Sequence, residues 1–208
     1  MSARFGSTIR SAEAARFFPL IGALIGVLGG SIYWLGAQIW PSNVAVILAM
    51  TGTTLLTTEF SSTSPATRID LLSRMFLLLI KYNALMSLSA AKLPFVVPPN
   101  LALGLIMICG HAASFALAVS AMAIRPEKAA ARIPNGSLSV ALLIGFAPAA
   151  LLGVPGLIGL AAAIFAGLCA VAYRNFKRAA GSGGVLDRIQ MLTEACFYLG
   201  ALAAWGYV

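Results

Sequence analysis

Long apolar runs alternate along this chain with short polar segments that contain most of its charged residues. An α-helix needs roughly 20 apolar residues to cross a bilayer, because each residue advances it by about 1.5 Å. The runs lack the two-residue alternation of a β-barrel, so their backbone groups must be satisfied inside helices. The runs that approach or reach this length are Phe17–Trp40, Asn43–Thr58, Leu71–Ala91, Leu101–Ile124, Leu138–Val154, Gly156–Tyr173 and Ile189–Val208. The pattern predicts an all-α, polytopic membrane bundle of about seven transmembrane helices.

The composition of the chain agrees with this class. Of its 208 residues, 60% are hydrophobic and 10% are charged, which excludes a water-soluble globule. No gap between runs is long enough for a soluble domain, so we expect residues 1–208 to form a single transmembrane domain. The cysteines Cys109, Cys169 and Cys196 lie singly inside runs and predict neither a metal site nor a disulfide framework. Basic stretches interleaved with aromatic residues are missing outside the runs, which argues against a nucleic acid partner.

The positive charges predict the orientation of the bundle. Every Lys and Arg residue except Lys81 and Lys92 lies in the amino-terminal segment, in alternate gaps, or at the edge of the run that follows such a gap. Positively charged loops are retained in the cytoplasm. We therefore expect a cytoplasmic amino terminus, an external carboxyl terminus and a charged face on the cytoplasmic side of a bacterial inner membrane. The net charge of +8 then lies where anionic lipid headgroups or phosphorylated molecules are met.

A charged stripe runs into the third apolar run. Asp70, Arg74 and Lys81 are spaced so that all three fall on one face of a helix. Charged groups within a membrane helix usually face a bundle interior or a polar cavity, which makes this face a candidate site. The alternative is a surface pair between Asp70 and Arg74, with Lys81 extending its ammonium group to the membrane edge.

A second polar face is predicted on the last helix. Asp187, Gln190 and Glu194 recur at intervals of three and four residues, and Mg²⁺ prefers such oxygen ligands. Asp187 could instead cap the helix amino terminus, but capping does not explain Glu194. Glu59, at the cytoplasmic end of the second run, would face these carboxylates.

The gap before that helix has the composition of a phosphate-binding loop. It combines glycines at positions 181, 183 and 184 with three cations, Arg174, Lys177 and Arg178. The alternative is an ordinary basic cytoplasmic loop. His111, inside the fourth run, is predicted to be a hydrogen-bonded interior residue because one histidine cannot form a metal site.

Small residues recur every fourth position in two runs, at Gly22, Gly26 and Gly30 and again at Gly159, Ala163 and Gly167. Such faces allow two helices to approach closely. We expect contacts within the bundle, and a homo-oligomer formed through one of these faces is the alternative.

Several segments resemble one family. Residues 18–22, Phe-Pro-Leu-Ile-Gly, followed by Gly26, resemble a segment of the cobalamin synthases, which are adenosylcobinamide-GDP ribazoletransferases. Residues 50–52, Met-Thr-Gly, resemble the entry into the acidic motif of that family. Leu77–Lys81 resembles its next span, and Gly181–Glu194 resembles its closing glycine-rich and acidic segment.

The order and spacing of the runs are similar as well, so the resemblance covers most of the chain. The sequence departs from the family at the acidic motif, where paired aspartates are expected and Glu59 is the only carboxylate. The chain thus resembles a divergent member of the family.

The resemblance implies a Mg²⁺-dependent membrane transferase. The 5′-hydroxyl of α-ribazole, or its phosphate, would attack the phosphoryl group attached to cobinamide and displace GMP, late in cobalamin biosynthesis. The carboxylates implied in catalysis are Glu59, Asp70, Asp187 and Glu194, of which Glu59, Asp187 and Glu194 would hold the metal. The cations implied in binding substrate phosphates are Arg74, Lys81, Arg174, Lys177 and Arg178.

Two other functions remain open. The missing aspartates favour a catalytically silent relative that binds the substrate or supports a partner enzyme at the membrane. A small transporter ranks third, because its charges should reach both membrane faces and those of this chain gather at one.

Overall fold

Helices form every regular element in the part of the chain that the computed structural model describes, which is residues 14–60, 68–90, 99–124, 133–176 and 185–205. The short 3₁₀-helix η1 (Ala14–Phe17) leads into the first α-helix. The α-helices are α2 (Phe18–Ile39), α3 (Ser42–Phe60), α4 (Arg68–Ala90), α5 (Pro99–Ile124), α6 (Asn135–Leu151), α7 (Val154–Phe176) and α8 (Val185–Trp205). The prediction of an all-helical membrane bundle is confirmed.

Proline and glycine set several of the helix boundaries. Pro19 occupies the first turn of α2, where its missing N–H costs no helical hydrogen bond. Trp40 is extended at the end of α2, as the residue before a proline prefers. Gly153 has a φ of 68° and reverses the chain between α6 and α7. Because of this turn, the predicted fifth run ended too late: its last residue, Val154, begins α7.

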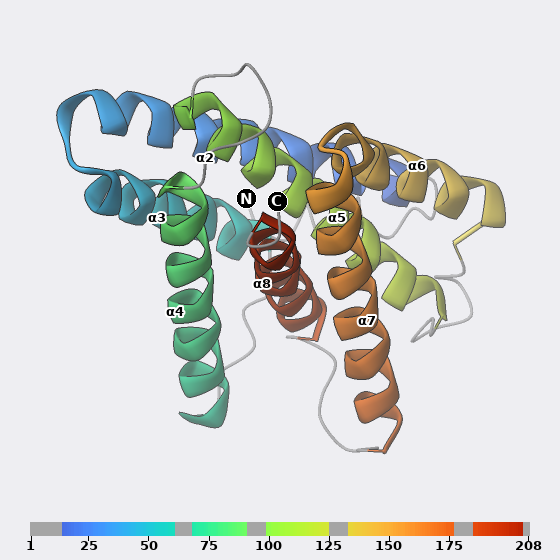
Figure 1. Ribbon diagram of the computed structural model, residues 1–208. Helices are drawn as coiled ribbons and strands as arrows, with labels where there is room; N and C mark the ends of the chain where they lie inside the picture. The colour runs from blue at the N-terminus through green and yellow to red at the C-terminus, as the bar shows by residue number, and fades with distance from the viewer. Residues whose placement is uncertain (1–13, 61–67, 91–98, 125–132, 177–184, 206–208) are drawn as a thin grey trace.

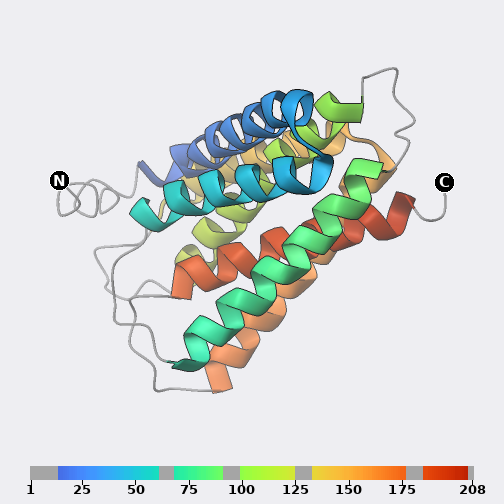
Figure 2. The same ribbon diagram turned by 90° about the vertical axis from the view of Figure 1, so that its left-hand side faces the viewer.

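Helix α5 lies at the centre of the bundle. Over its apolar stretch 78% of the residues are buried, against 22% to 39% in the other long apolar helices. α2 and α3 run antiparallel along one side of it (Figure 2), and α8 lies between α4 and α7 (Figure 1). The main core joins large side chains of several helices, including Tyr33, Leu85, Ile106 and Phe197.

Both small-residue faces are used inside the chain. A Cβ atom added to Gly26 would lie 2.5 Å from the Ile108 Cα of α5, and one added to Gly30 would lie 2.8 Å from the Gly104 Cα. On α7, a Cβ atom at Gly159 would lie 2.8 Å from the Phe197 backbone oxygen of α8. These close contacts confirm the packing role inside the bundle.

The length and composition of the helices fit a membrane. Four apolar segments within the described helices are long enough to span a bilayer, namely Ala15–Ile39, Leu71–Ala90, Leu101–Ile124 and Val154–Tyr173. Ser42–Thr57 and Asn135–Leu151 are shorter apolar helices. α8 belongs to neither group because Asp187, Arg188 and Glu194 lower its hydropathy. The predicted number of helices is thus found, while four of them qualify as spans by length and composition alone.

Candidate functional site

Two ion pairs join α4 and α8. Arg74 Nη2 lies 2.5 Å from Asp187 Oδ2, and Lys81 Nζ lies 2.6 Å from Glu194 Oε1. The partners are seven residues apart on each helix and pair in the same order, so the two helices run parallel, as Figure 2 shows. Seven residues advance a helix by about 10 Å. The two pairs are therefore separate sites along one interface.

The deeper pair belongs to a buried network. The Lys81 and Glu194 side chains are only 8% and 4% exposed. Glu194 Oε1 also accepts a hydrogen bond of 3.0 Å from the Tyr198 hydroxyl, and His111 Nδ1 lies 3.1 Å from the same oxygen. Lys81 and Tyr198 therefore both donate to one carboxylate oxygen, which offsets the cost of burying its charge. Lys81 does not extend to the membrane edge as the alternative interpretation required.

His111 is held by α5 and α8 together. Its Nδ1 atom lies 3.0 Å from the Met107 backbone oxygen and 3.2 Å from the Tyr198 hydroxyl. Because a carbonyl oxygen only accepts, Nδ1 carries the proton. Gly110 makes room for this arrangement, since a Cβ atom there would lie 2.6 Å from the Tyr198 ring. The predicted interior, hydrogen-bonded histidine is confirmed.

The second pair, Arg74–Asp187, lies near the amino-terminal ends of α4 and α8. Asp187 is in the first turn of α8, where the helix dipole favours a negative charge. It lies inside the helix and is not the capping residue. Arg74 remains 30% exposed while Asp187 is 5% exposed, and the Arg74 Nε atom has no hydrogen-bond acceptor among the described residues. Arg74 is therefore a partly accessible cation, while its Nε atom is itself buried.

The remaining predicted site residues belong to helix ends and gaps at one end of the bundle. The carboxyl ends of α3 and α7 and the amino ends of α4 and α8 lie at the same end (Figure 2). Glu59, Asp70 and Arg174 belong to these helix ends, and their side chains lie outside the described part. Lys177 and Arg178 fall outside the described residues altogether.

The described carboxylates do not form a magnesium site. No group of three or more metal-binding side chains occurs within the described residues. Asp187 and Glu194 are two helical turns apart, and each is neutralised by its own cation. An ion at this end of the bundle would need further ligands such as Glu59.

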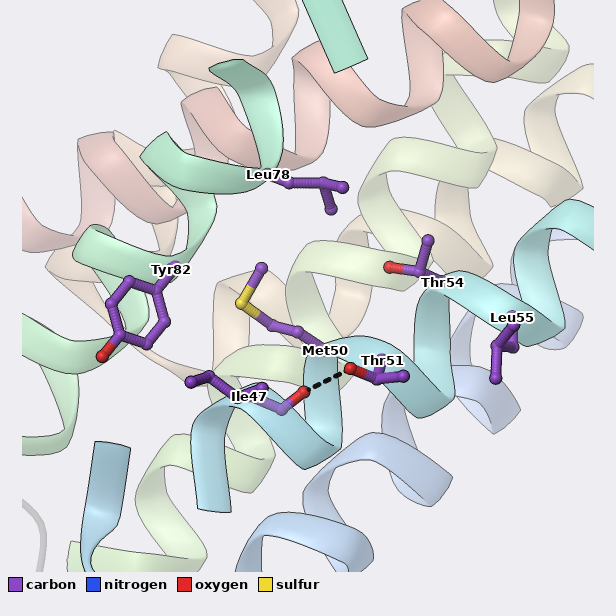
Figure 3. A pocket seen from close by; sticks show the side chains of 7 residues that line it. All are labelled: Ile47, Met50, Thr51, Thr54, Leu55, Leu78 and Tyr82. Carbon is purple, nitrogen blue, oxygen red and sulfur yellow. Dashed lines mark hydrogen bonds between the residues drawn. The ribbon is translucent and has the colours of Figure 1, made fainter. Parts of the chain in front are cut away.

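A small polar cavity adjoins the Lys81–Glu194 pair. It has a volume of about 10 Å³, roughly that of one water. Its lining residues are Thr54, Thr57, Leu77, Leu78, Lys81, Gln190, Met191 and Glu194. Thr54 and Leu78 also line a separate, larger apolar pocket between α3 and α4, shown in Figure 3.

Sequence reasoning did not include Tyr198 in the site. Tyr198 follows Glu194 by four residues and therefore lies on the same face of α8. Its spacing was the available signal, but an aromatic residue within an apolar run does not stand out as a member of a polar site. The place of His111 beside Glu194 depends on contact between α5 and α8, which has no local signal.

The comparisons with known proteins find similarity in the amino-terminal part of the chain. The family described as cobalamin-5-phosphate synthase matches residues 3–60. The adenosylcobinamide-GDP ribazoletransferase of Leptothrix cholodnii is 42% identical over 57 residues, which are 27% of this chain and 22% of that protein. The proteins of the same name from Shewanella amazonensis and Ralstonia nicotianae are 40% identical over 58 residues and 49% identical over 49 residues. They cover 28% and 23% of this chain.

The matched segment is a small part of this chain and of each relative. It covers about a fifth of the length of these relatives, 22% of the Shewanella protein and 19% of the Ralstonia protein. In this chain it corresponds to η1, α2 and α3 and ends next to Glu59. The two ion pairs on α4 and α8 lie beyond it, so the expectation of resemblance over most of the chain is met only for residues 3–60. No solved structure matches the chain.

Proposed function

We propose that this chain is a membrane transferase of cobalamin biosynthesis that joins α-ribazole, or its 5′-phosphate, to adenosylcobinamide-GDP and releases GMP. The similarity of residues 3–60 to cobalamin-5-phosphate synthase and to the ribazoletransferases supports this class of reaction. The single observation that carries the proposal further is that the matched helix α3 ends at the same end of the bundle as the Arg74–Asp187 pair. An acidic helix end and a partly accessible cation then share one boundary.

In this reaction the oxygen of a free ribose hydroxyl of the acceptor forms a bond to the phosphorus attached to cobinamide. The bond from this phosphorus to the GMP oxygen breaks, and GMP leaves with the electron pair. Negative charge on the phosphoryl oxygens is best stabilised by fixed cations. Arg74 is the described residue suited to this role because its side chain is partly exposed. Asp187 beside it is suited to accept the proton of the attacking hydroxyl.

The other cations and carboxylates extend this proposal. Arg174, Lys177 and Arg178 would bind phosphates from the end of α7, and Lys81 would stabilise Glu194 at the base of the site. Glu59 and Asp70 would complete the acidic end, and Mg²⁺ would join them with Asp187. In the same proposal this end faces the cytoplasm at a bacterial inner membrane, where soluble nucleotides are available.

A catalytically silent relative is the second candidate, and one observation favours it. The described site has two cations and two carboxylates that neutralise each other. A substrate phosphate would have to displace Asp187 from Arg74 before it could bind there. A protein that keeps the pairs intact would hold its helices together without transferring anything. For a transporter, the charges of the described helices would have to continue beyond Lys81 and Glu194 to the other end, and they do not.

The test is turnover by the reconstituted full chain. Proteoliposomes are supplied with adenosylcobinamide-GDP, α-ribazole and Mg²⁺, and both GMP release and the corrinoid product are measured. The proposal predicts both products in equal amounts, with loss on chelation and recovery when Mg²⁺ is restored. Binding of adenosylcobinamide-GDP without any GMP release would favour the silent relative.

A further inference from the structure

The small polar cavity beside the Lys81–Glu194 pair has the dimensions of a site for one water molecule. Its volume is about 10 Å³, and a cavity of roughly this size holds a water when two to four polar groups are in reach. Polar side chains line it from three helices: Thr54 and Thr57 from α3, Lys81 from α4, and Gln190 and Glu194 from α8. The cavity therefore meets both conditions, space and polar partners.

The Lys81 ammonium group has hydrogen-bonding capacity left for such a ligand. An ammonium group carries three N–H donors. Glu194 Oε1, 2.6 Å away, is the only hydrogen-bond acceptor of Lys81 among the described residues. The Lys81 side chain is 8% exposed and Gln190 is 7% exposed, so bulk water reaches neither freely. A water bound beside them would accept from Lys81 and reduce the cost of burying both polar groups.

The charges around the cavity exclude an ion as its ligand. A cation placed there would be repelled by Lys81, and an anion would be repelled by Glu194. The two charges compensate each other at 2.6 Å, and either ion would disturb this pair. The volume excludes any group as large as a phosphate. A neutral molecule of the size of water, which both donates and accepts hydrogen bonds, is the ligand that fits.

We propose that this cavity is a binding site for one internal water molecule, which accepts a hydrogen bond from Lys81 and also hydrogen-bonds to Gln190 and to a threonine of α3. The water would link α3, the last helix of the segment that matches the cobalamin-5-phosphate synthase family, to the ion-paired helices α4 and α8. The site is separate from the Arg74–Asp187 pair, and its test needs no turnover. It is therefore independent of the proposed transferase activity.

The experiment compares thermal unfolding of the full chain and of Gln190→Leu in the same detergent. Leucine keeps a similar volume and removes the amide. If a water is bound, it loses one of its hydrogen-bond partners, and we expect Tm to fall by about 2–4 °C, the equivalent of roughly one hydrogen bond in a chain of this size. If the cavity is dry, the same change removes a poorly solvated amide from the interior, and Tm should rise or stay the same.

Thr51→Val is the matched control. Thr51 lines the larger apolar pocket and not the small cavity, and its hydroxyl donates a 2.8 Å hydrogen bond to the Ile47 backbone oxygen. Its replacement should change Tm less than Gln190→Leu does. A second measurement does not depend on any variant: a density map of the full chain in nanodiscs, at a resolution that shows ordered waters. It should contain one solvent peak about 3 Å from Lys81 Nζ. A cavity without this peak, or a Gln190→Leu protein whose Tm is not lowered, would overturn the proposal.

Discussion

At the residue scale, Glu194 is the group on which the buried network depends. Replacing it by glutamine keeps its shape but leaves the Lys81 ammonium buried without a counter-charge. Breaking a buried ion pair from one side costs about 3–5 kcal/mol. We expect Glu194→Gln to lower the unfolding free energy by this order, measured by denaturant unfolding in detergent micelles.

The double variant Lys81→Met with Glu194→Gln separates stability from function. Removing both charges eliminates the uncompensated cation, so we expect most of the lost stability to return. If Glu194 contributes to transfer, GMP release stays low in the double variant. A double variant that recovers full turnover would assign both residues a purely structural role.

Arg74 is the residue with which substrate phosphate binding can be tested. Arg74→Gln removes the partly exposed cation beside Asp187, and we expect the KM for adenosylcobinamide-GDP to rise by roughly 10- to 100-fold, equivalent to one charge-assisted interaction. Arg16→Gln is the control. Arg16 is exposed at the start of the bundle and stacks 4.7 Å over Phe17, so its loss should leave KM unchanged. Equal increases in KM for the two variants would mean that substrate binding depends on the overall positive charge of the protein and not on Arg74 in particular.

At the scale of elements, the crossing of α2 and α5 has almost no space between backbones. A Cβ atom at Gly26 would meet the Ile108 Cα at 2.5 Å, whereas one at Gly104 would lie 3.4 Å from the Gly30 Cα, an ordinary contact. We expect Gly26→Ala to destabilise the protein by about 1–3 kcal/mol, because backbone atoms would have to separate.

Gly104→Ala should be neutral or slightly stabilising, since alanine is the better helix former. The comparison is made by thermal unfolding of both variants in the same detergent. If Gly104→Ala is as unstable as Gly26→Ala, then the helix crossing has no room for a Cβ atom at Gly104 either.

At the scale of the whole molecule, the orientation of the bundle can be tested with single cysteines. In a variant without the three native cysteines, Ser42→Cys probes the turn between α2 and α3, and Gly136→Cys probes the start of α6; both positions are exposed. With a cytoplasmic amino terminus, an impermeant maleimide labels Ser42→Cys in intact cells. Gly136→Cys reacts only after the cells are permeabilised. The reverse pattern would place the charged end outside.

The sequence by itself determined the helical class, the approximate extent of each helix and the gathering of charge at one end. These properties are local: an apolar run of sufficient length must form a helix in lipid, because no water is there to satisfy the backbone. Spacing also placed Arg74 and Lys81 on one face of α4, and Asp187 and Glu194 on one face of α8.

Only the tertiary structure decided which groups meet. The pairing of Lys81 with Glu194, and the contact of both with Tyr198 and His111, depends on the crossing of α4, α5 and α8. Those crossings are set by small residues such as Gly110, whose missing side chain admits the Tyr198 ring. Helix periodicity gives the face of each residue but not the neighbouring helix. The partner of a buried charge therefore follows from packing between segments far apart in the chain.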